Sequence, residues 1–112
     1  MALASKYRLT GKQLARVFKQ GKTVKNSFFF IRFISNDLGF ARVAVIVPVK
    51  VLRKATARNY LKRFVIETIR TKHFLENSYD VIITATSNIV GKQPEEIKRG
   101  LEQTTNIIFV QK

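Results

Sequence analysis

The chain has 112 residues, 46% of them hydrophobic, and a formal net charge of +14, so we expect one folded domain over 1–112 that is attracted to a polyanion. Cysteine is absent, which excludes a disulfide framework and any cysteine-based metal or thiol site. No apolar run approaches the roughly 20 residues of a membrane span, and the N-terminus lacks the long apolar segment of a secretory signal, so we expect a cytoplasmic protein without a membrane partner.

The first elements predicted along the chain are a helix and a strand pair. Thr10 and Gln13 match a capping box, and apolar residues then recur at helical spacing, so a helix is expected over 11–20. The aromatic and β-branched run SFFFIRFI, residues 27–34, has strand character. Residues 23–25 are expected to add a short strand before it.

The strand at 27–34 is apolar on both faces, which favours a central position in a sheet. Strict alternation assigns one face to Phe28, Phe30, Arg32 and Ile34, and the other to Phe29, Ile31 and Phe33. A turn signal at 36–39 precedes a second strand at 42–49, and the two strands are expected to form a hairpin. Pro48 cannot donate a ladder hydrogen bond, so the second strand should end at an edge or a bulge.

A basic connection at 50–56 leads into a second helix, expected over 55–72. Its predicted buried stripe is Leu61, Phe64, Val65, Thr68 and Ile69. At about 100° per residue, the opposite side holds Asn59, Lys62, Arg63 and Arg70, with Arg58 at the border. The helix should therefore present a basic surface to solvent or to a ligand.

The last third of the chain predicts a strand and a final helix. YDVIITA, residues 79–85, is a nearly continuous apolar strand, typical of burial on both faces. Pro94 suits a first helical position. The final helix is expected to bury Ile97, Leu101, Thr104 and Ile108. The predicted order is helix, three strands, helix, strand, helix.

Positive charge is concentrated in the first two thirds of the chain. Residues 1–72 hold 17 Lys or Arg against two acids, whereas residues 73–112 hold four against five. A solvated helix face normally mixes Glu with Lys, but the predicted helix at 55–72 has one acid, Glu67. A basic membrane helix would carry a broad apolar face for insertion, and here the apolar faces are needed for the core. We therefore expect contact with RNA or DNA phosphates, for which planar Arg is the better bidentate partner.

The phenylalanines of the strand at 27–34 have two interpretations. Phe29 and Phe33, with Ile31 on the same predicted face, are expected in the core. Phe28 and Phe30 are balanced between the core and a flat surface beside the charge, of the kind that single-stranded nucleic acid binds. Arg32 on the same predicted face indicates that part of that face reaches water.

A self-sufficient active site is not predicted. The single histidine, His73, follows the second helix and is expected to meet its C-terminus or solvent, and Glu95 and Glu96 fit helix capping. The sequence shows no paired carboxylates, glycine-rich phosphate loop or metal-ligand cluster. No catalytic or metal-binding residue is therefore assigned, and no cofactor is expected on the protein itself.

Six motifs follow one another in the order and spacing of a known family. They are RLTGKQLARVFKQG, the aromatic strand, a strand leading to a lysine, ARNYLKR on a helix, YDVIITA and a last amphipathic helix, together spanning about 7–109. This order resembles the protein subunit of bacterial ribonuclease P. The family signature is Arg-Asn-Arg followed, after one residue, by Lys-Arg, and here it reads Arg58-Asn59-Tyr60-Leu61-Lys62-Arg63.

The resemblance implies an architecture and an activity. The architecture is an α/β (α+β) two-layer sandwich, a sheet of about four strands packed by helices, of the ribosomal protein S5 domain 2 type, with a left-handed β-α-β crossover. The holoenzyme is an endoribonuclease that removes the 5′ leader of precursor tRNA, and its RNA subunit with bound Mg²⁺ is the catalyst. The protein is then expected to bind ribonuclease P RNA and precursor tRNA, with no protein partner required.

The resemblance and the basic helix face assign residues to two surfaces. Contacts with the RNA subunit are expected from Arg53, Lys54, Arg58, Asn59, Lys62, Arg63 and Arg70. A cleft for the single-stranded leader, between the first helix and the sheet, is expected from Phe18, Phe28, Phe30, Arg32 and Lys50. Leu14 and Arg32 stand where the family often has aromatics.

The chain departs from the family pattern at basic positions. Tyr60 replaces the second arginine of the signature, and Val51 the second of a usual lysine pair. Ile66 occupies a position where a basic residue is common, and it lies in the middle of the predicted basic helix face, where solvent exposure is expected. Arg53 and Lys54 are expected to restore lost charge. An alternative stays open, a general structured-RNA-binding or ribosome-associated domain of the same fold without leader recognition. Nothing in the sequence favours a third class, an intrinsic nuclease.

Overall fold

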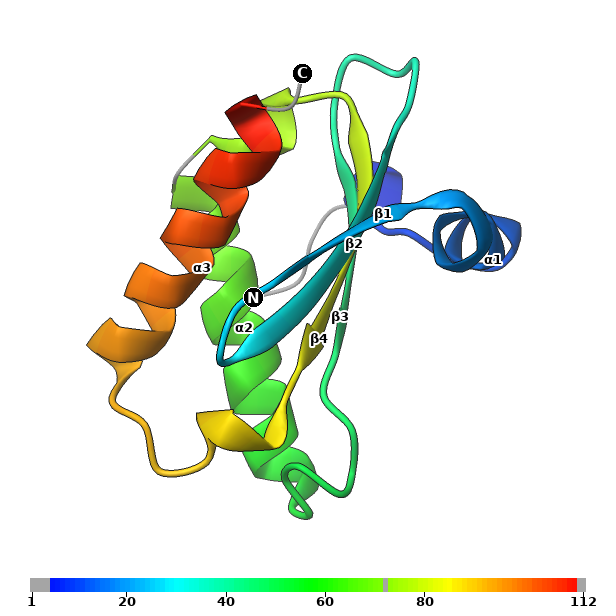
Figure 1. Cartoon of the computed structure of the whole chain (residues 1–112). Helices are drawn as coiled ribbons and strands as arrows, with labels where there is room; N and C mark the ends of the chain where they lie inside the picture. Colours follow the sequence, from blue (N-terminus) through cyan, green and yellow to red (C-terminus); the bar gives the residue numbers. More distant parts are fainter. Residues whose placement is uncertain (1–4, 72, 111–112) are drawn as a thin grey trace.

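A four-stranded mixed sheet separates the helices into two groups (Figure 1). The computed structural model describes residues 5–71 and 73–110. The strands are β1 (Lys22–Lys25), β2 (Phe29–Ser35), β3 (Arg42–Ile46) and β4 (Tyr79–Ala85). On one side of the sheet lie α2 (Ala55–Thr71) and α3 (Pro94–Val110), and on the other lies α1 (Lys12–Gln20). Short 3-10 turns occupy Ser5–Tyr7, Phe74–Glu76 and Ser87–Ile89. The α+β class and the predicted element order are confirmed.

The predicted elements shift slightly at their ends. The Thr10 N–H donates to Gln13 Oε1 at 3.0 Å, which is one half of the predicted capping box, and α1 begins after Gly11, whose φ is 55°. β3 ends at Ile46, before Pro48, whose carbonyl then accepts amides of the following turn. The predicted last residue of the second helix, Lys72, lies outside the described residues.

The predicted hairpin between the strands at 27–34 and 42–49 is wrong. The sheet order is β1-β2-β4-β3, so β4 lies between them, antiparallel to β2 and parallel to β3. The predicted burial of β4 on both faces is confirmed, because Val81, Ile82 and Ile83 are all almost inaccessible to solvent. An edge position would expose such an apolar strand to solvent, so β4 takes an inner position in the sheet. The turn after β2 passes over the first residues of β4.

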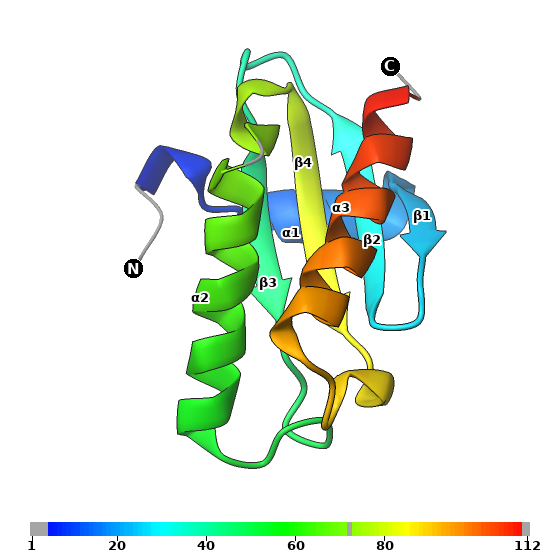
Figure 2. The same cartoon turned by 90° about the vertical axis from the view of Figure 1, so that its left-hand side faces the viewer.

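The β3–α2–β4 connection is a left-handed crossover, as the resemblance implies. In Figure 2 the helices stand in front of the sheet, β3 and its parallel neighbour β4 run downwards, and β4 lies to the right of β3. A right-handed crossover, the strongly preferred form, would put β4 on the left. The exception sets which face of the sheet α2 covers and leaves the opposite face to α1.

The main core lies between the sheet and the pair α2 and α3. The predicted α2 stripe is buried at Leu61, Val65, Thr68 and Ile69, and Phe64 packs against it partly buried. All four predicted α3 residues are buried, Ile97, Leu101, Thr104 and Ile108. From the sheet, Phe29, Ile31 and Phe33 face these helices, which confirms the expectation that they are core.

Phe28 does not share a face with Phe30, which corrects the strict alternation predicted for this strand. Asn26 Oδ1 accepts the amide of Phe28 at 2.7 Å and that of Phe29 at 2.8 Å, a local turn that delays the start of β2. The Asn26 amide group also donates to the Gly100 carbonyl at 2.8 Å, which fixes the turn against α3. The Phe28 ring consequently packs on the helix side of the sheet, beside Gly100.

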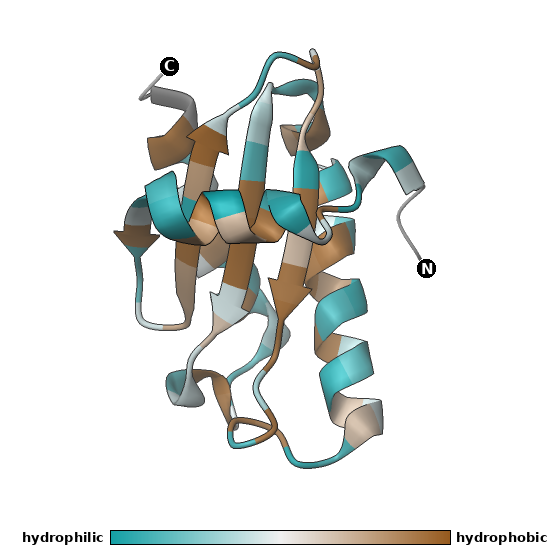
Figure 3. Ribbon diagram, turned by 90° about the vertical axis from the view of Figure 1, so that its right-hand side faces the viewer, coloured by the Kyte–Doolittle hydropathy of each residue, from teal (hydrophilic) through white to brown (hydrophobic). Residues whose placement is uncertain are grey.

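The opposite face of the sheet carries a smaller apolar cluster under α1. Leu9, Val17 and Ile82 are its buried members, and Leu14 is partly buried against them. Figure 3 shows α1 lying across the strands, so that it covers one part of this face and leaves another part open. Within the described residues, no helix has the length and apolar character needed to cross a membrane.

One buried carboxylate joins four segments at the start of β4. Asp80 is fully buried and accepts two hydrogen bonds from Arg42, at 2.9 and 2.7 Å. Asn36 Nδ2 donates to Asp80 at 2.9 Å, and Arg16 Nη1 of α1 lies 3.6 Å from the same carboxylate. The hydrogen bond to Asp80 raises the pKa of Arg42 against the opposing effect of burial. These contacts hold β3, β4, the turn after β2 and α1 together.

Replacing Asp80 by Asn should lower the free energy of unfolding by about 3–5 kcal/mol, because it leaves Arg42 without its charged partner in a buried site. Glu67→Gln is the matched control, since Glu67 makes a partly exposed ion pair with Arg70 and should cost at most about 1 kcal/mol. Urea unfolding measures both. Equal, small losses for the two variants would show that the Asp80 contacts do not stabilise the fold.

Candidate nucleic-acid interface

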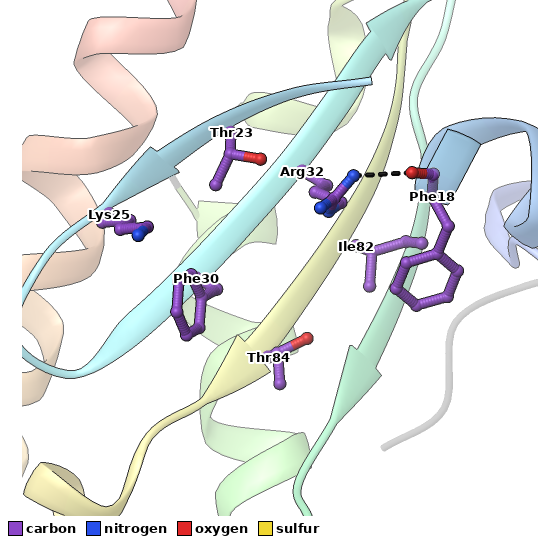
Figure 4. Close-up of a pocket in the computed structure, with 7 residues that line it drawn as sticks. All are labelled: Phe18, Thr23, Lys25, Phe30, Arg32, Ile82 and Thr84. Atoms are coloured by element: carbon purple, nitrogen blue, oxygen red, sulfur yellow. Dashed lines mark hydrogen bonds between the residues drawn. The ribbon is translucent and has the colours of Figure 1, made fainter. Parts of the chain in front are cut away.

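A groove follows the open part of the sheet face beside α1 (Figure 4). Its first section, of about 470 Å³, is lined by Phe18, Thr23, Lys25, Phe30, Arg32, Ile82 and Thr84. Its second section, of about 440 Å³, is lined by Phe30, Pro48, Lys50, Val51, Thr84, Ala85, Thr86 and Ser87. Because Phe30 and Thr84 line both, the two sections form one continuous surface, which we call the sheet groove.

Two phenylalanine rings of the sheet groove are open to solvent. Phe18 of α1 is 49% exposed and Phe30 of β2 is 42% exposed, whereas the neighbouring Phe29 is fully buried on the other face. Figure 4 shows the two rings on either side of Thr84 and Ile82. Large exposed apolar groups gathered in one hollow mark a binding surface more often than an isolated exposed residue does.

Arg32 fastens α1 to the sheet within the groove. Its Nη1 donates to the Phe18 carbonyl at 2.6 Å (Figure 4). That carbonyl lies in the last turn of α1, where backbone oxygens lack partners inside the helix and the helix dipole is negative. The hydrogen bond therefore fixes the position of Phe18 relative to β2 and holds a planar cation in the wall of the groove.

Lys25 and Thr23 also line the sheet groove, although the sequence pattern did not predict them there. β1 pairs with β2 so that Lys25 stands opposite Phe30 and Thr23 opposite Arg32, which puts each pair on one face. Lys25 Nζ lies 5.0 Å from the centre of the Phe30 ring, a cation–π contact. The sequence did predict the short strand at 23–25. Its pairing register with the next strand, which places Lys25 opposite Phe30, could not be predicted from it.

Four of the five residues predicted for the leader cleft meet in the sheet groove. Phe18 and Arg32 line its first section, Lys50 its second, and Phe30 both. Phe28 lies outside the groove, on the α3 side, because the turn at Asn26 places its side chain on the other face of the sheet. The groove thus combines two open rings with three cations supplied by β1, β2 and the segment after β3.

A second cationic surface is built on the first half of α2. Arg58 Nη1 donates to the carbonyls of Leu52 at 2.9 Å and Arg53 at 2.7 Å, which ties the preceding loop to the helix. The predicted residues that gather here are Arg53, Lys54, Arg58, Asn59, Lys62 and Arg63, and we call this set the α2 basic surface. Arg70 lies about 18 Å further along the helix, at 1.5 Å per residue, and pairs there with Glu67.

The departures from the family pattern have separate structural settings. Around α2, Tyr60 is rotated by about 160° from both Arg58 and Lys62 and by about 60° from Arg63. It therefore lies at the border of the α2 basic surface and lines a hollow beside α3. Val51 is buried in the main core. Ile66 is half-buried, whereas the sequence pattern predicts exposure.

His73 and the acidic residues near it do not form a catalytic or metal-binding cluster. His73 follows α2, its amide donates to the Arg70 carbonyl, and its exposed ring lies 2.7 Å from Glu76, which agrees with the predicted place at the helix end. Among residues 5–71 and 73–110, no three His, Cys, Asp or Glu side chains are gathered where they could hold a metal ion.

Known proteins similar to this chain point to one family. The Ribonuclease P family model matches residues 3–108. The ribonuclease P protein component of Thermotoga maritima is 37% identical over 68 residues, which cover 60% of this chain and 57% of that protein, so the match spans little more than half of the relative. The solved RNase P protein from Thermotoga maritima has a TM-score of 0.77 at 25% identity, covering 88% of this chain and 96% of that one. The RNase P protein of Staphylococcus aureus has a TM-score of 0.82 at 24% identity, covering 91% and 94%, and supports the fold alone.

Replacing Arg58 by Ala should speed amide hydrogen exchange at residues 51–54, because the loop loses both hydrogen bonds from the guanidinium. Arg58→Lys keeps the charge but lacks the planar fork, so it should restore little of the protection. Lys62→Ala removes a neighbouring charge and is the control. Protection that is unchanged in Arg58→Ala would mean that this residue does not hold the loop.

Proposed function

The chain belongs to the ribonuclease P protein family, and we propose that it is the protein subunit of a bacterial ribonuclease P. In that role it assists the endonucleolytic removal of the 5′ leader from precursor tRNA. The α2 basic surface binds the ribonuclease P RNA, and the sheet groove holds the single-stranded leader. The RNA subunit, which binds the Mg²⁺ ions, carries the hydrolysis of the phosphodiester bond.

The observation that carries the proposal is the composition of the sheet groove. A single RNA strand offers unpaired bases and phosphates along its length, and proteins bind it with flat rings beside a cationic track. Phe18 and Phe30 supply exposed rings, and Lys25, Arg32 and Lys50 supply charge along the same continuous hollow. A base-paired helix hides the faces of its bases, so the two rings favour a single strand.

Two RNAs can bind at once because the two surfaces belong to opposite sides of the sheet. The sheet groove lies on the α1 side, and α2 packs on the other side (Figure 1). Ribozyme and substrate are both polyanions that repel each other, and repulsion at close range is weakened by cations placed between them. The protein therefore replaces part of the Mg²⁺ that the RNA subunit would otherwise need for binding its substrate.

The groove also explains how substrate and product are distinguished. Only the precursor carries a leader, so only the precursor gains the contacts with Phe18, Phe30 and the neighbouring cations. Mature tRNA lacks the strand that fills the groove and is held less tightly after cleavage. Affinity that depends on the leader favours substrate binding and product release together.

The direct test is cleavage of a precursor tRNA by a bacterial ribonuclease P RNA at low Mg²⁺, with and without the chain. We expect strong stimulation that fades as the leader is shortened, because a shorter strand fills less of the groove. Stimulation that is independent of leader length would contradict leader binding. Lack of stimulation with RNA binding intact would favour a general structured-RNA-binding domain.

Replacing Phe30 by Ala should lower the preference for precursor over mature tRNA by about five- to a hundredfold, because stacking of one base on an aromatic ring contributes about 1–3 kcal/mol. Leu38→Ala is the control, since Leu38 is 45% exposed and lies in the turn after β2, outside the groove. Affinities of the reconstituted complex for both tRNAs give the ratio. An equal ratio in wild type and Phe30→Ala would exclude Phe30 from leader binding.

A further inference from the structure

A separate hollow lies on the flank of α2 that faces α3, at the border of the α2 basic surface. It has a volume of about 220 Å³ and is formed between the first half of α2 and the segment that joins β4 to α3. The side chains that matter for its chemistry are Leu52, Tyr60, Phe64, Ile89, Lys92 and Pro94. We call it the α2–α3 pocket, and neither of the two surfaces described above includes it.

We propose that the α2–α3 pocket binds one unpaired nucleobase of an RNA that contacts α2. The ring of Tyr60 provides the stacking surface, and Lys92 contacts the phosphate next to the bound base. The proposal rests on the proposed function for the expectation that RNA lies against α2, and it adds a base-binding site that the charge pattern alone does not predict.

The size and lining of the pocket fit a single ring system. Its volume is smaller than the roughly 300–1,000 Å³ of sites for drug-sized ligands, so it holds a group of about one base and not an extended segment. Phe64, Ile89 and Pro94 give it apolar walls, with Lys92 as its one charged lining residue. A nucleobase presents two apolar faces to such walls and keeps its polar edge at the open mouth.

Tyr60 is the feature that selects an aromatic ligand. Its side chain is 60% exposed, although most large apolar side chains of α2 are turned inward. A tyrosine ring is flat and has only two side-chain torsions to fix, so stacking on it costs little conformational entropy. Bases of unpaired RNA stack on such rings irrespective of sequence, because every base has a π face.

Charge decides between RNA and an apolar protein segment as the occupant. Lys92 lines the pocket, and Arg53 and Lys54 follow Leu52 directly in the sequence, so an approaching ligand meets cations at the N-terminal end of α2. Glu95 and Glu96, next to Pro94, are exposed on the first turn of α3. They repel phosphates on that side and favour a path of the RNA backbone on the α2 side.

The first arm of the test measures binding of ribonuclease P RNA by Tyr60→Ala and Tyr60→Phe. The Ala variant should bind about five- to a hundredfold more weakly because it loses the stacking ring, while the Phe variant stays within about twofold of wild type. The salt dependence should not change in either, since no charge is removed, whereas Lys62→Ala should lower the salt slope by about one.

The second arm locates a nucleobase directly in the protein labelled at isoleucine δ1-methyl groups. Adenosine 5′-monophosphate should shift the signals of Ile89 and Ile97, which line the pocket, and ribose 5-phosphate, which lacks the base, should not. The shifts should vanish in Tyr60→Ala and persist in Tyr60→Phe. Ile82, in the sheet groove, reports whether the nucleotide binds there instead.

The proposal requires both results, and the failure of either overturns it. Unchanged RNA binding by Tyr60→Ala together with weakened binding by Lys62→Ala would remove the pocket and leave the proposed function intact. Unchanged binding by both variants would contradict the assignment of α2 as an RNA-binding helix. Nucleotide shifts confined to Ile82, or equal shifts with ribose 5-phosphate, would show that the pocket does not take a base. Because Tyr60 is largely exposed, its variants should keep the unfolding midpoint of wild type.

Discussion

The burial of β4 on both faces is the constraint from which the arrangement of the other elements follows. A strand whose residues alternate between two apolar environments needs a layer on each side and a neighbouring strand at each edge. β2 and β3 are the strands paired with β4 on its two sides, α2 and α3 cover one face, and α1 covers part of the other. Placing β4 between two strands that precede it in the chain requires the crossover through α2, and here that crossover is left-handed. Asp80, the second residue of this strand, then joins β3 and α1 to it through Arg42 and Arg16.

The partial cover provided by α1 leaves part of the sheet open on that side. α1 rests on Ile82 with Leu14 and Val17, and the face beyond Ile82 stays open as the sheet groove. Arg32 sets the spacing between α1 and β2 by its hydrogen bond to the Phe18 carbonyl. The same residue is therefore part of the framework and part of the wall. In the proposed function this rigidity matters because rings that are already positioned bind a flexible strand with a smaller loss of entropy.

Local patterns predicted the elements well, and what they missed depended on contacts between distant segments. Helical and strand periodicity gave α2, α3 and β4 with their buried residues. The hairpin prediction failed because turn chemistry at 36–39 is compatible with strands that are neighbours or separated by a third strand. Phe28 was misplaced because the Asn26 turn delays the start of β2 from residue 27 to residue 29, so Phe28 precedes the strand and does not follow its alternation.

For the site, Phe30 and Arg32 were predicted from the strand pattern, whereas Phe18 and Lys50 were assigned from the resemblance to the family. Lys25 was missed because its contact with Phe30 depends on strand register. From the sequence, Tyr60 was interpreted only as the loss of a positive charge in the signature. Its position beside α3 could not be predicted, because it depends on how the two helices pack. Charge patterns thus indicated a nucleic-acid partner, while the placement of the two proposed surfaces on opposite sides of the sheet needed the tertiary structure.

Site-directed cross-linking tests most directly whether two RNAs occupy two separate surfaces. The chain has no cysteine, so Thr23→Cys in the sheet groove, Asn59→Cys on the α2 basic surface and Lys98→Cys on α3 can each carry one photoreactive group. In the complex with ribonuclease P RNA and precursor tRNA, position 23 should cross-link to the leader and position 59 to the RNA subunit, with little cross-linking from position 98. Cross-linking of the leader at position 59, or of the RNA subunit at position 23, would contradict the account.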